Sequence, residues 1–181
     1  MSRRVWTAAA AAVFFLPRIA SAQSEVERAV LPLPETERAG ATVMAIEGSE
    51  YVTVREGSGT FVCLADDPGT ERFHASCYHE SLEPYMARGR ELRAGGIEGR
   101  ESVMKRAEEI EAGSLDMPEM GLLHQLFAQA GWDGDVSTAT RLTVIYVPYK
   151  TEADVGVPTS RSAGPWMMFP GQPVAHIMIP G

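Results

Sequence analysis

The sequence predicts an α+β fold, in which a small antiparallel sheet is built from N-terminal and C-terminal strands with two or three helices between them. Short apolar runs separated by turn residues gather at both ends of the chain. The middle of the chain instead has apolar residues at helical spacing. Strands grouped apart from helices are typical of α+β domains, so we expect residues 41–181 to form a single globular domain.

The first 22 residues have the pattern of a secretory signal peptide. Arg3 and Arg4 give a positive start, residues 5–16 form an apolar run, and the small residues 20–22 provide the cleavage site. The apolar run is too short to cross about 30 Å of hydrocarbon as a helix. We therefore expect cleavage after Ala22, no membrane anchor after cleavage, and export to the periplasm or the extracellular space.

After the signal, we expect a flexible leader followed by three short strands. The leader covers residues 23–40, because Pro32 and Pro34 stop any helix that begins there. Glycine-rich turns then separate runs of strand-forming residues. The predicted strands are residues 41–46, 51–55 and 60–65.

The middle of the chain has three helical patterns, and the last third returns to strands. Ser81 is a suitable N-cap for a first helix, which Gly95 and Gly96 end. Further helices are predicted at residues 100–112 and 120–130 from the spacing of their apolar side chains. The C-terminal strand candidates are residues 142–149, 166–169 and 174–179.

The chain is acidic, with 16 Lys and Arg residues against 24 Asp and Glu residues and a net charge of -8. Loss of Arg3, Arg4 and Arg18 with the signal leaves 13 basic residues and a net charge of -11. Nucleic-acid binding depends on phosphate neutralisation by Lys and Arg. No nucleic-acid partner is therefore expected, and an anionic membrane surface is disfavoured for the same reason.

Cys63 and Cys77 are the two cysteines of the chain. In an exported protein this number predicts a disulfide bond between them. Such a bond constrains the unfolded chain by about 3 kcal/mol in the chain-entropy model. The alternative is a free Cys77 thiolate activated by His74 or His79, but a second cysteine in an oxidising compartment argues against it.

A metal site is the alternative interpretation of the segment that contains His74, Cys77 and His79. Zinc accepts thiolate and imidazole ligands, and His176 from a C-terminal strand offers a further imidazole. Methionines near His176 also suit copper in its Cu(I) state. Because a disulfide removes Cys77 as a ligand, the candidate zinc or copper site consists of His74, His79 and His176, with Asp67 as a further donor.

Trp166 and Phe169 lie among prolines and are candidates to line a ligand groove, although such aromatic residues also fill core corners. No phosphate-binding loop, G-x-S-x-G elbow, H-E-x-x-H motif or dinucleotide motif occurs. We therefore predict a non-catalytic binding or interaction protein without a cofactor, whose partner is a small molecule or a protein. The alternative is a metal-binding protein or metal-dependent enzyme that uses His74 and His79.

Overall fold

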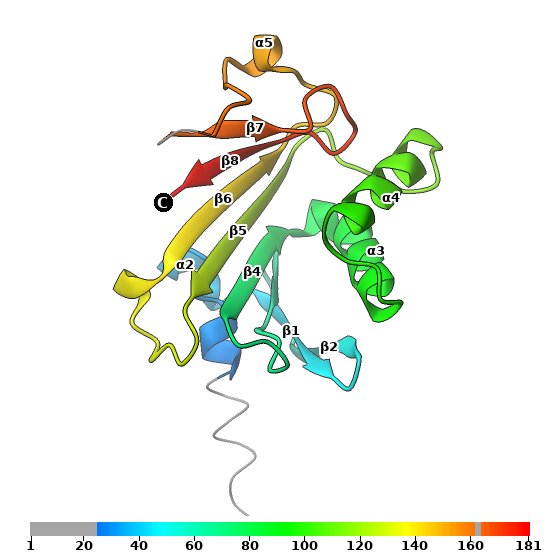
Figure 1. Ribbon diagram of the computed structural model, residues 1–181. Coiled ribbons are helices and arrows are strands. Elements are labelled where there is room, and N and C mark those ends of the chain that lie inside the picture. The colour runs from blue at the N-terminus through cyan, green and yellow to red at the C-terminus, as the bar shows by residue number, and fades with distance from the viewer. Residues whose placement is uncertain (1–24, 162–163) are drawn as a thin grey trace, which may run out of the picture.

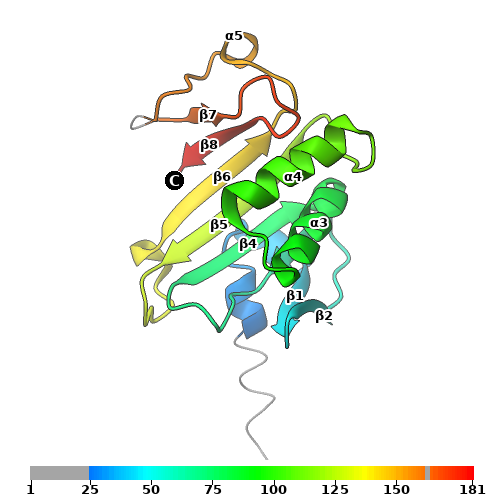
Figure 2. The same ribbon diagram turned by 45° about the vertical axis from the view of Figure 1, so that its right-hand side comes forward.

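An eight-stranded sheet carries two helices on one of its faces (Figures 1 and 2). The computed structural model describes residues 25–161 and 164–181, so the predicted signal peptide lies outside the described residues. Within the described part, no helix is both long and apolar enough to cross a membrane. The strands are β1 (Thr42–Glu47), β2 (Glu50–Arg55), β3 (Phe61–Leu64), β4 (Phe73–His79), β5 (Gly121–Ala128), β6 (Thr140–Tyr146), β7 (Trp166–Met168) and β8 (His176–Pro180).

Two longer helices and several single turns connect these strands. The longer helices are α3 (Glu83–Ala94) and α4 (Gly99–Glu111), which follow one another between β4 and β5. The short elements are α2 (Glu35–Arg38), η1 (Glu80–Leu82), η2 (Val136–Thr138) and α5 (Glu152–Val155).

The strands lie side by side in the order β2-β1-β3-β4-β5-β6-β8-β7. All neighbouring pairs are antiparallel except β1 and β3, which are parallel. The tight turn between β1 and β2 contains Gly48 at a φ of 69°, a conformation that favours glycine. The mixture of helices and strands agrees with the predicted class, but the sheet is larger than predicted and is not wholly antiparallel.

The two central strands account for the larger sheet. β4 was not predicted, and the helix predicted at residues 120–130 is wrong because residues 121–128 form β5. β5 pairs with β4 on one side and with β6 on the other. Both of its faces are also covered, because Leu123 packs in the cluster under the helices and Leu126 packs in a cluster with Leu31 of the N-terminal segment. The apolar pairs at residues 122–123 and 126–127 also fit helical spacing, which is why periodicity failed here.

Helices α3 and α4 cover one face of the sheet (Figure 2). Tyr85 of α3 and Ala107 of α4 pack in one cluster with Tyr78 of β4, Leu123 of β5 and Val144 of β6. None of these five side chains is more than 5% exposed. The first two of the three predicted helices are therefore present, and they cover the main core on one face of the sheet.

The N-terminal segment, residues 25–40, packs on the opposite face of the sheet. Ala29 and Leu33 are each 1% exposed and lie in one cluster with Cys63 and Cys77. This packing differs from the flexible leader that we predicted for the segment. Burial of its apolar side chains offsets the entropy lost when the segment is ordered.

Candidate ligand-binding groove

The predicted disulfide joins Cys63 of β3 to Cys77 of β4, with a Cα–Cα distance of 4.0 Å. The two residues are direct partners in the antiparallel ladder and neither is exposed. The prediction of the disulfide is thus confirmed. In this oxidised form, Cys77 offers no thiolate as a nucleophile or as a metal ligand.

The three imidazoles proposed for a metal site do not lie together. His74 and His79 are five residues apart on β4, so they point to opposite faces of the sheet. His176 lies on β8, with β5 and β6 between it and β4. Within residues 25–161 and 164–181, no group of three or more His, Cys, Asp or Glu side chains is arranged to hold a metal ion.

Each of these histidines has another neighbour instead. The His74 ring stacks on Phe127 with a centroid distance of 4.5 Å, and His79 Nδ1 lies 2.9 Å from the Ser81 hydroxyl. The buried His176 donates from Nδ1 to its neighbouring backbone carbonyl, that of residue 174, at 2.8 Å. Burial lowers the pKa of both His74 and His176, and for His74 the charge of nearby Arg93 adds to this effect.

Trp166 and Phe169, the two aromatic residues proposed to line a ligand groove, pack against neighbouring side chains of the protein. Trp166 of β7 is 8% exposed, and the Arg161 guanidinium lies 4.8 Å from its ring centroid. Phe169 packs against His176 with a centroid distance of 5.7 Å. Neither aromatic residue lines the two hollows described below.

The most basic hollow of those described lies between α3, α4 and the sheet and has a volume of about 200 Å³. It is lined by three arginines and by several polar side chains, with no Asp or Glu in its wall. Tyr51, Leu64, Ala65, Met86 and Gly89 complete the lining. We call this hollow the arginine groove; its arginines are Arg90, Arg93 and Arg106, and its other polar residues are His74, Ser76, Ser102 and Gln125.

Arg90 is neutralised from within the protein. Its Nη2 lies 2.5 Å from Glu83 Oε1, and its Nη1 donates to the Tyr78 hydroxyl at 2.8 Å. The same hydroxyl donates to Glu83. Tyr78 is fully buried, and burial raises the pKa of its hydroxyl. This hydroxyl therefore stays protonated and fixes Arg90 in place.

Arg93 also has carboxylate partners. Its Nη2 lies 2.5 Å from Asp67 Oδ2, and its Nε lies 3.2 Å from Glu98 Oε1. Asp67, which we considered as a further metal donor, precedes Pro68 in the turn after β3 and pairs with Arg93 instead. The charge of Arg93 is thus largely balanced before any ligand arrives.

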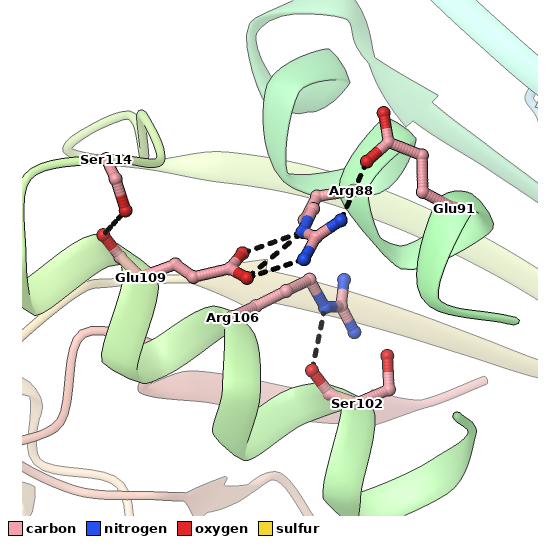
Figure 3. Close-up of polar contacts among 6 residues, drawn as sticks. All are labelled: Arg88, Glu91, Ser102, Arg106, Glu109 and Ser114. Carbon is pink, nitrogen blue, oxygen red and sulfur yellow. Dashed lines mark hydrogen bonds and ion pairs between the residues drawn. The ribbon is translucent and has the colours of Figure 1, made fainter. Parts of the chain in front are cut away.

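Arg106 differs, because it lies within 4.0 Å of no carboxylate in the described chain. Its Nε donates to the Ser102 carbonyl at 3.2 Å (Figure 3) and its Nη1 donates to the Tyr85 carbonyl at 3.1 Å. The guanidinium lies 3.9 Å from the Tyr85 ring centroid, a cation–π contact. Arg106 is therefore held rigidly while its charge remains available.

The position of Arg106 depends on an ion pair between the two helices. Nε and Nη2 of Arg88 in α3 donate hydrogen bonds to both carboxylate oxygens of Glu109 in α4, with N–O distances of 2.7 to 3.1 Å (Figure 3). Arg88 lowers the pKa of this carboxyl group, which therefore stays ionised. Glu109 lies three residues beyond Arg106, so the same contact holds the part of α4 that bears Arg106.

Two serine hydroxyls face the arginine groove without a partner. Ser76 of β4 and Ser102 of α4 are each only 6% exposed and both line the groove. Neither hydroxyl makes a hydrogen bond to another group of the described chain. Neither oxygen is among the fully buried, unpartnered side-chain atoms of the described residues, so both hydroxyls stay accessible to a ligand or to water.

A second hollow of about 420 Å³ lies on the other side of α3, against β1 and β2. It shares Tyr51, Arg90 and Arg93 with the arginine groove. Burial raises the pKa of the shared Tyr51 hydroxyl. We call this hollow the acidic hollow, because its remaining charged residues are Glu50, Asp67, Glu91 and Glu98.

No family model matches this chain, and no curated protein or solved structure is significantly similar to it.

The residues of the arginine groove were missed in the sequence because they come from separate elements. Ser76 and Gln125 belong to strands that were not recognised as such, and the arginines belong to two helices. One signal was present: basic residues gather between Arg88 and Arg106 in an otherwise acidic chain.

Proposed function

We propose that this chain is an exported, non-catalytic binding protein for a small molecule that carries an oxyanion, either a carboxylate or a phosphate. The observation that supports this best is Arg106, which lines the arginine groove and forms no ion pair with a carboxylate of the described residues. The signal-like N-terminus supports export, and the buried disulfide is compatible with it.

The chemistry of the groove favours an oxyanion over other ligands. Guanidinium groups present planar N–H donors that match carboxylate and phosphate oxygens. The unpaired hydroxyls of Ser76 and Ser102 and the amide of Gln125 add neutral donors around the same space. A cation is disfavoured, because the wall of the groove contains no carboxylate.

Calorimetric titration with inorganic phosphate, sulfate and acetate tests the proposal. We expect at least one of these anions to bind the unmodified protein, and Arg106→Met to weaken its binding by on the order of tenfold, since hydrogen bonds to charged groups contribute about 1.5–3 kcal/mol. Ser76→Ala should weaken binding by a smaller factor.

Lys105→Met is the matched control. Lys105 is the exposed neighbour of Arg106 on α4 and does not line the groove, so its loss changes the net charge equally. Equal losses in the two variants would mean that only the general electrostatic field matters. That result, or the absence of binding to all three anions, would refute the proposed site.

A further inference from the structure

We propose that the natural ligand is a zwitterion, whose oxyanion occupies the arginine groove while an ammonium group at its other end faces the acidic hollow. This inference rests on the proposed function and extends it, since it names the class of ligand. It comes from the opposite charges of two hollows that share part of their walls.

The two hollows have opposite charge outside their shared residues. The arginine groove adds Arg106 and no carboxylate, whereas the acidic hollow adds four carboxylates and no base. The shared Arg90 and Arg93 are already paired with Glu83, Asp67 and Glu98. A ligand that lies across both hollows therefore meets positive charge at one end and negative charge at the other.

Glu50 is the best candidate partner for the ammonium group. Glu91 pairs with Arg88 at 2.9 Å, and Asp67 pairs with Arg93. Glu50, at the start of β2, is exposed and lies within 4.0 Å of no basic side chain in the described residues. Its carboxylate is thus free to pair with a ligand without breaking an internal contact.

The region between the charged ends suits a hydrocarbon linker. Met44 and Ile46 of β1 and Ala87 and Ala94 of α3 contribute apolar surface to the acidic hollow. The half-buried Tyr51 belongs to both hollows and offers a ring surface where they adjoin. The acidic hollow has a volume of about 420 Å³, which lies within the range of about 300–1,000 Å³ that is typical of small-molecule sites.

Calorimetry with simple aliphatic compounds separates the contributions of the two ends. The probes are hexanoate, hexylamine and 6-aminohexanoate, with the four-carbon and eight-carbon amino acids of the same type to test length. We expect 6-aminohexanoate to bind about twofold to fivefold more tightly than hexanoate, the range for an exposed ion pair. Hexylamine should bind most weakly, because it lacks the oxyanion.

Glu50→Gln should remove the advantage of the amino group and leave hexanoate binding unchanged. The matched control is Glu47→Gln, because Glu47 lies opposite Glu50 in the β1–β2 hairpin but does not line the hollow. The advantage should persist in that control. Circular dichroism of both variants checks that the hairpin remains folded.

The outcomes distinguish the two proposals. If hexanoate binds and depends on Arg106, but the amino group adds nothing at any chain length, the zwitterion is refuted and the oxyanion site stands. Persistence of the advantage in Glu50→Gln refutes the assigned partner. If hexylamine binds as tightly as 6-aminohexanoate, or if no probe depends on Arg106, both proposals fail.

Discussion

Gly89 of α3 lies directly against the guanidinium of Arg106 of α4. A Cβ atom at residue 89 would stand 2.9 Å from Arg106 Nη1 and 3.2 Å from Cζ. Real Cβ atoms essentially never approach a neighbour closer than 3.0 Å. The missing side chain of Gly89 therefore lets Arg106 cross α3 and reach the Tyr85 carbonyl.

Gly89→Ala is expected to displace Arg106 and to weaken oxyanion binding. Alanine itself favours a helix by about 1 kcal/mol over glycine, so the thermal midpoint should stay the same or rise while affinity falls. Calorimetry and thermal denaturation of the same variant measure the two effects. In the Gly89→Ala, Arg106→Met double variant the affinity should match that of Arg106→Met alone. Additive losses would show that Gly89 does not act through Arg106.

Removal of the disulfide is expected to cost stability without moving the arginine groove. Replacing both Cys63 and Cys77 by alanine should lower the free energy of unfolding by about 2–5 kcal/mol, the usual loss when a small secreted domain loses a native disulfide. Urea denaturation measures this loss. Reduction of the unmodified protein should have a similar effect, and an unchanged urea midpoint in both experiments would contradict the expectation.

Leu33→Ala tests the packing of the N-terminal segment. Because Leu33 is 1% exposed and belongs to the cluster around the disulfide, its truncation should destabilise the protein by about 2–5 kcal/mol. Glu35→Ala in the neighbouring turn, where the side chain is exposed, serves as the control. A loss of less than about 0.5 kcal/mol for Leu33→Ala, the usual size of a surface effect, would mean that the segment is not held as the structure describes.

Three histidines with lowered pKa values should make the protein less stable at mildly acidic pH. Burial lowers the pKa of His74, His124 and His176, so below about pH 6.5 the unfolded chain binds more protons than the folded one. Their contribution to stability is therefore present at neutral pH and is lost as the pH falls. Nuclear magnetic resonance titration of the imidazole protons should give values below about 6.5 for all three.

His176→Phe should reduce this pH dependence. The replacement keeps an aromatic ring between Tyr146 and Phe169 but cannot take a proton. Urea denaturation between about pH 7.5 and pH 5, a window that brackets the ordinary histidine value, should show a smaller decrease in the free energy of unfolding than in the unmodified protein. An equal decrease in both proteins would mean that His176 is not responsible.

The strands that pair at the edges of the sheet could be predicted, whereas those at its centre could not. β1 and β2 were recognised because turn residues bound them and their composition favours strands. β5 has neighbouring strands on both sides, and its apolar residues pack on both faces, Leu123 under the helices and Leu126 beside the N-terminal segment. Alternation, the strand signal, is therefore absent from the sequence Gly121–Ala128, and only its pairing partners determine its conformation.

The disulfide was predictable from the sequence for a different reason. With two cysteines in the chain, only one intramolecular pair is possible. The metal hypothesis relied instead on the short distance in sequence between His74 and His79. The structure does not support it, because successive residues of a strand point to opposite faces of the sheet. The separation between His74 and His79 is odd, which places their rings on opposite sides of β4.

By itself, the sequence determined the mixture of helices and strands, the cysteine pair and the signal-like start, because each of these depends on local composition or on counting. The tertiary structure alone decided the arginine groove, since its members are brought together by helix packing and strand pairing. It also decided which of the three groove arginines lacks an ion pair. Glu83 pairs with Arg90 within α3, and Asp67 reaches Arg93 from the turn after β3. Charge availability at Arg106 is a property of three-dimensional neighbours, which a linear pattern does not contain.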